Sequence, residues 1–152
     1  MKSLLNYARS IESLERRIVL DAVQPTIYEQ YAIELLNRAR ANPTAEAARY
    51  SIALNEGPPS TTLGTEARQP LAVNMYLTDS ARDHVDWLRA NGVFSHTGSG
   101  GSSPTARMVS AGYGTSGSFS SGENLAVTMS SQAIGNITTE VDKHERNLFV
   151  DD

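Results

Sequence analysis

Apolar residues recur at intervals of three and four along most of the chain, which is the spacing of one face of an α-helix. The first such segment covers residues 1–22, where charged positions separate the apolar ones. Its apolar stripe consists of Leu4, Tyr7, Ile11, Leu14 and Ile18. The pattern predicts an amphipathic helix that docks on the domain or serves as a mobile leader. Two heptads are too few to indicate a coiled coil.

Capping signals predict the next two helices. Thr26 and Glu29 have the spacing of a capping box, which predicts a helix that starts there and stops at Asn42. Asn42 and Pro43 are then suited to the cap and the first position of a third helix. We expect this third helix to continue to residue 56, because Gly57 and Pro58 follow it.

The strongest helical pattern lies in residues 70–92. Its apolar stripe consists of Leu77, Ala81, Val85 and Leu88, and Asn91 with Gly92 forms a stop signal. His84 falls on the same stripe. A histidine at such a position is more often a hydrogen-bonded core residue than a ligand, so we expect His84 to be structural.

The last third of the chain predicts two more helices and one strand. Ser103 caps a short helix that runs from Pro104 to Ala111. The apolar segment 123–129 is suited to a strand, and residues 131–149 can form a final helix. With only one predicted strand, the sequence contains too few strands to form a sheet. Either the domain is essentially all-α, or its remaining strands lie beyond Asp152.

Composition narrows the possible functions. The 152 residues are enough for one domain, and 17 acidic against 13 basic residues give a net charge of −4, which argues against a nucleic-acid partner. Cysteine is absent, which excludes disulfides, thiolate metal sites and a cysteine nucleophile. Apolar runs are too short for a transmembrane segment, and no Sec-type signal peptide is visible, so export would need another route.

Few residues offer chemistry. The chain has three histidines and several carboxylates, but no HExxH, GxSxG or Walker motif. His96 stands between Phe94 and a Gly/Ser-rich run that lacks the lysine of a phosphate-binding loop. We expect Phe94 to be a buried aromatic whose truncation is more destabilising than that of His96.

Four motifs in order carry a resemblance to a known family: LLNRARANP, PLAVNMYLTDSARDHVDWL, FSHTGSGGSSPTARMVSAGY and GENLA. Together they resemble the bacterial branch of the CAP superfamily of cysteine-rich secretory proteins, antigen 5 and plant pathogenesis-related proteins, over residues 26–152. The resemblance implies an α+β fold, an α-β-α sandwich whose cleft is lined by two histidines and two acids. By motif, His96 is the first cleft histidine and Glu123 the first cleft acid.

The chain departs from this pattern at its end. Family members with this layout carry a later Gly-His-Arg-x-Asn stretch that supplies the second histidine, and no such stretch occurs here. Residues 144–147 (HERN) resemble it, but one extra residue breaks the spacing. His144 is therefore expected on the outer or packing face of the last helix, and Glu140 is only a candidate for the second acid. The expected organisation is a leader at residues 1–25 and a C-terminally truncated, helix-rich CAP domain at 26–152 that lacks most of its central sheet.

Three functions are compatible with these residues. The first is an extracellular or cell-surface module, part of a longer chain, that binds an unknown ligand or protein partner, such as a lipid or a divalent metal. The second is a hydrolase or peptidase that uses His96 and Glu123, and the third is a purely structural domain. No cofactor is required. In a complete domain, His96 and Glu123 could help to bind Zn²⁺ or another divalent cation, or they could only hydrogen-bond two loops together.

Overall fold

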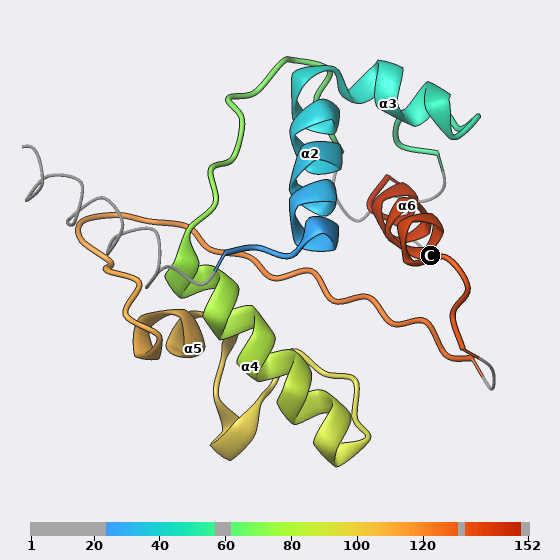
Figure 1. The fold of residues 1–152 in the computed structure, drawn as a ribbon. Coiled ribbons are helices and arrows are strands. Elements are labelled where there is room, and N and C mark those ends of the chain that lie inside the picture. The colour runs from blue at the N-terminus through green and yellow to red at the C-terminus, as the bar shows by residue number, and fades with distance from the viewer. Residues whose placement is uncertain (1–23, 57–61, 131–132, 150–152) are drawn as a thin grey trace, which may run out of the picture.

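The computed structural model describes residues 24–56, 62–130 and 133–149 (Figure 1). The expected leader helix at residues 1–22 lies outside this part. The helical elements, in chain order, are α2 (Ile27–Ala41), α3 (Pro43–Arg49), α4 (Met75–Asn91), the 3₁₀ turn η1 (Ser99–Gly101), α5 (Pro104–Ser110) and α6 (Ile137–Asn147). The helix-rich character expected from the sequence is therefore confirmed.

The caps at the start of α2 and α3 are those predicted. Thr26 accepts a hydrogen bond from the Glu29 backbone at 3.2 Å, and the Glu29 side chain accepts one from the Thr26 backbone at 2.6 Å. Asn42 caps α3. The expected continuation of α3 to residue 56 was wrong. Ser51 and Asn55 adopt positive φ angles of 58° and 62°, which a continuous helix does not allow.

The ends of the later helices follow local chemistry. Gly92 ends α4 with a φ of 62°, in the left-handed region that glycine adopts without strain. The Ser103 side chain caps α5 as predicted. Helix α6 starts at Ile137, later than expected, because Asn136 accepts hydrogen bonds from the Thr138 and Thr139 backbones and so fixes the start of the helix.

The strand predicted at residues 123–129 does not form, and no strand occurs in the described ranges. Figure 1 shows this segment as an extended chain that crosses the molecule between α5 and α6. A β-strand requires a neighbouring strand to share its backbone hydrogen bonds, and apolar sequence alone cannot supply one. The described part therefore contributes helices and loops, without the sheet of an α-β-α sandwich.

The core is small and centres on α2, which packs against both α3 and α6. Ala47, Ile52 and Phe149 form its buried cluster. Beside them, the buried carboxylate of Glu46 accepts two hydrogen bonds from Arg38 and one from Arg49. This pairing satisfies a charge that would otherwise be costly to bury.

Helices α4 and α5 form a second packed pair. An ion pair of 2.6 Å between Arg82 and Glu29 joins α4 to the first turn of α2. No helix in the described part of the chain is long and apolar enough to cross a membrane.

Candidate functional site

The loop after α4 and the extended segment after α5 meet at His96 and Glu123. Nδ1 of His96 lies 2.9 Å from Oε2 of Glu123. Arg107 of α5 donates a hydrogen bond of 2.6 Å to Oε1 of the same carboxylate. The structure thus brings together the two residues singled out by the sequence, and it adds a third.

The charge of Glu123 fixes the role of each ring nitrogen of His96. Burial favours a protonated Glu123, but the hydrogen bonds from His96 and Arg107 outweigh it and lower the pKa of this carboxyl group. An ionised carboxylate only accepts hydrogen bonds, so Nδ1 of His96 is the donor. In the neutral ring, Nε2 is then an acceptor without a partner in the described part of the chain, on a side chain that is 59% exposed.

Arg107 holds the site together, and it was not predicted as a site residue, although it lies within the motif FSHTGSGGSSPTARMVSAGY. Its Nη1 donates to the backbone carbonyls of His96, at 3.0 Å, and Ser102, at 2.9 Å. One guanidinium therefore connects the histidine loop, η1 and the carboxylate. Gly98 permits this close approach, since a Cβ there would lie 2.9 Å from Nη1.

His84 of α4 contacts the loop that carries His96. Its side chain is 2% exposed, and Nε2 lies 3.0 Å from the Ser95 carbonyl, one residue before His96. The ring stacks on Trp87 with an interplanar angle of 10°. The prediction of a hydrogen-bonded core histidine is confirmed. The ring also lies 3.9 Å from Glu123, close enough to contribute to the site, which the sequence did not predict.

Glu140 and His144 form a separate cluster around Thr128. Thr128 donates to Glu140 at 2.8 Å, and its oxygen lies 3.2 Å from Nε2 of His144. The hydrogen bond from Lys143 is the main cause of a lowered pKa at Glu140. His144 is half-buried, as expected of a packing face. Glu140 is hydrogen-bonded to Thr128 and Lys143, and not to the pair formed by His96 and Glu123.

Phe94 is 54% exposed, so the expectation that it is a buried aromatic was wrong. It lies in the loop after α4, beside a groove of about 520 Å³ that α2 and α6 also line. The apolar residues of this groove include Ala32, Leu36, Leu125, Val127 and Leu148. The described part of the chain therefore leaves about half of the Phe94 side chain uncovered.

The arrangement does not form a metal site by itself. Within the described ranges, no three His, Asp or Glu side chains gather as metal ligands. Glu123 is already hydrogen-bonded to two donors, and the guanidinium of Arg107 lies beside it. A cation would have to compete with that positive charge.

Comparison with known families agrees with the motifs. The family model described as the cysteine-rich secretory protein family, CAP, matches residues 33–151. No curated protein and no solved structure matches the chain. The family match covers α3, α4, α5 and α6, most of α2, and both His96 and Glu123. It implies an α-β-α sandwich, of which the described part contains helices. The chain therefore belongs to the CAP family, although it contains no cysteine.

Proposed function

We propose that this chain is a ligand-binding CAP module of an exported or surface protein, with His96 as its recognition residue. The observation that carries the proposal is the contact of 2.9 Å between Nδ1 of His96 and Glu123. It orients an exposed imidazole so that Nε2 can accept a hydrogen bond from a ligand. Glu123 acts through His96, as a carboxylate does when it holds a histidine in one tautomer.

The ligand class that fits the surroundings is a lipid with a polar, hydroxyl-bearing head. The apolar groove beside Phe94 begins two residues before His96, and Asn124, next to Glu123, also lines it. Burial of an alkyl or ring system there would cover apolar side chains, and the head could donate to Nε2 of His96. The acidic net charge of −4 disfavours anionic lipids and leaves neutral ones.

The test is flotation of the 152-residue chain with neutral phosphatidylcholine vesicles that contain cholesterol. We expect co-flotation, weakened by His96→Ala without loss of helical circular dichroism. Arg89→Ala is the control, because that exposed side chain pairs only with Asp86 among the described residues. Absence of binding, or equal binding by the wild type and His96→Ala, would contradict the proposal.

A hydrolase is the second candidate, and the same contact favours it. A carboxylate that fixes the Nδ1–H tautomer leaves Nε2 as a general base. The exposure of His96 weighs against this candidate, because active sites exclude water to strengthen their electrostatics. Hydrolysis of p-nitrophenyl acetate by the wild type, lost in His96→Ala, would favour the enzyme. If His96→Ala leaves both binding and hydrolysis unaffected, the role of the pair is structural.

A further inference from the structure

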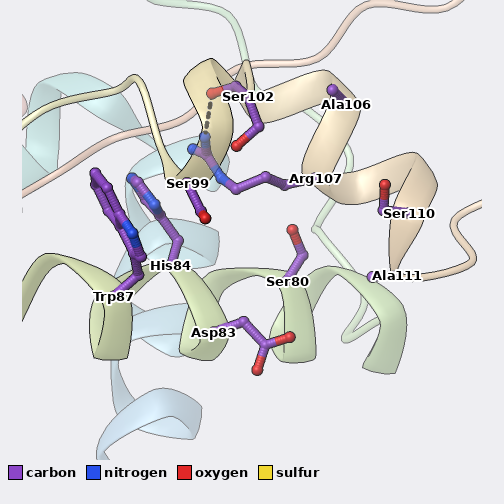
Figure 2. Close-up of a pocket in the computed structure, with 10 residues that line it drawn as sticks. All are labelled: Ser80, Asp83, His84, Trp87, Ser99, Ser102, Ala106, Arg107, Ser110 and Ala111. Carbon is purple, nitrogen blue, oxygen red and sulfur yellow. Dashed lines mark hydrogen bonds between the residues drawn. The ribbon is translucent and has the colours of Figure 1, made fainter. Parts of the chain in front are cut away.

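A second cavity lies between α4, η1 and α5, separate from the apolar groove. Its volume is about 370 Å³, near the lower end of the range of small-molecule sites, about 300–1,000 Å³. Figure 2 shows its lining, in which Ser80 of α4 points up towards Arg107 and Ser99 of η1 points down towards α4. Neither His96 nor Glu123 lines it.

Hydroxyl groups recur along the wall of this cavity. Four serines contribute to it: Ser80, Ser99, Ser102 and Ser110. Trp87 adds an indole surface to the same wall. Hydroxyl groups can donate and accept without carrying charge, and an indole packs well against the C–H groups of a saturated ring.

Two residues that line this cavity each carry a buried atom with no hydrogen-bond partner among the described residues, namely Nδ1 of His84 and Nε of Arg107. Because Nε2 of His84 donates to the Ser95 carbonyl, Nδ1 of the neutral ring is an acceptor. Nε of Arg107 carries a hydrogen and is a donor. A ligand hydroxyl is both donor and acceptor, so one such group matches either atom.

Gly98 determines how a ligand reaches His84. A Cβ at this position would lie 3.1 Å from Nδ1, so the Gly98 backbone covers that face of the ring. The glycine loop must shift slightly when a hydroxyl binds Nδ1. Its neighbours Gly100 and Gly101 adopt positive φ angles of 63° and 79°, which only glycine adopts readily.

The charges around the cavity select against an anion. The guanidinium of Arg107 is already paired with Glu123 at 2.6 Å. Asp83 also lines the cavity and adds a negative charge without a cation of its own there. A phosphate or carboxylate ligand would therefore meet no unpaired positive charge.

We propose that this cavity binds a neutral pyranose unit, either a free monosaccharide or the end of a glycan. One ligand hydroxyl donates to Nδ1 of His84, another accepts from Nε of Arg107, and the C–H face of the sugar packs against Trp87. This cavity and the apolar groove have no lining residue in common, although Arg107 and His84 also contact the loop and the carboxylate that position His96.

The test uses the fluorescence of Trp87, the single tryptophan of the chain. The folded 152-residue chain is titrated with D-glucose, D-galactose, D-mannose and N-acetyl-D-glucosamine, and with their methyl glycosides. We expect a saturable change in intensity, in the millimolar range, for at least one of them. A response to the free sugar alone indicates a free monosaccharide, and a response to the glycoside indicates a glycan end. If none of these sugars or glycosides changes the fluorescence in a saturable way, the proposal is overturned.

A matched pair of variants ties the signal to the cavity. Ser110 lines the cavity but is exposed, so Ser110→Leu narrows the cavity without disturbing the core. We expect this variant to lose the saturable fluorescence change. Val109→Leu alters the neighbouring exposed residue, which does not line the cavity, and should leave the change intact. Equal responses in both variants, or saturation by sodium phosphate in place of sugars, would overturn the proposal.

Discussion

His96 and Glu123, separated by 27 positions in the sequence, are joined by a contact of 2.9 Å between Nδ1 and Oε2. The contact ties the loop after α4 to the segment after α5. Because Arg107 binds the other carboxylate oxygen, Glu123 is hydrogen-bonded at both oxygens, while Nε2 of His96 has no partner among the residues that the structure describes. This asymmetry predicts that the two residues contribute unequally to stability and to binding.

Replacement of Glu123 by glutamine should cost about 2 kcal/mol of unfolding free energy, because it leaves the largely buried Arg107 without a counter-charge. His96→Ala should cost less than about 1 kcal/mol, since that side chain is mostly exposed. Urea unfolding followed by circular dichroism measures both. Equal costs would show that His96 is chiefly structural.

Acid should weaken the link between α2 and α4. The hydrogen bond from Arg82 lowers the pKa of Glu29 from 4.5 to about 2. A lowered folded-state pKa gives stability that is present above pH 4.5 and is lost as the pH falls towards 2. The expected loss is about 1 kcal/mol after solvent screening, because Glu29 is one-third exposed. The pH dependence of unfolding should be flatter in Glu29→Gln, and an unchanged profile would contradict this.

At Glu145 of α6, the dependence of stability on pH is expected to run in the opposite direction from that at Glu29. This side chain is 4% exposed, and burial raises its pKa more than the nearby Tyr50 hydroxyl lowers it. A raised folded-state pKa gives stability that is present at low pH and is lost as the pH rises through that value.

Glu145→Gln should therefore stabilise the protein by about 1 kcal/mol at pH 7, because it removes a buried charge whose desolvation outweighs its favourable contacts. The gain should shrink below pH 4.5, where the free carboxyl group is protonated. Thermal melts at the two pH values measure it, with the exposed Glu34→Gln of α2 as control. A loss of stability at pH 7 would show that the charge is compensated.

Zinc should bind weakly. Glu123 is committed to Arg107, and a closed zinc site requires four ligands. Calorimetric titration of the chain with zinc chloride should show no sub-micromolar affinity. Tight binding that disappears in His96→Ala would mean that the pair opens to admit the ion.

The sequence predicted what local chemistry determines and missed what depends on packing. Thr26 and Asn42 revealed the starts of α2 and α3 because a cap is recognisable within four residues. Phe94 looked buried because it is aromatic, but its burial depends on the elements that face it. The strand at 123–129 failed for the same reason, since its partner is not local.

The sequence likewise predicted only some of the residues of the candidate site. Family motifs identified His96 and Glu123, and the structure brought them together. Arg107 was missed because no spacing rule links a residue of α5 to a carboxylate 16 positions later. His84 was placed correctly in the core, but its distance from Glu123 follows only from how α4 packs beneath the loop.

The most direct test of the central claim is the tautomer of His96. Long-range ¹H–¹⁵N correlation spectra of the labelled chain near neutral pH should show hydrogen on Nδ1 and a bare Nε2. In Glu123→Ala, the ring should revert to the Nε2–H form that free histidine prefers. An Nε2–H tautomer in the wild type, unchanged by Glu123→Ala, would contradict the claim that Glu123 orients His96 for recognition.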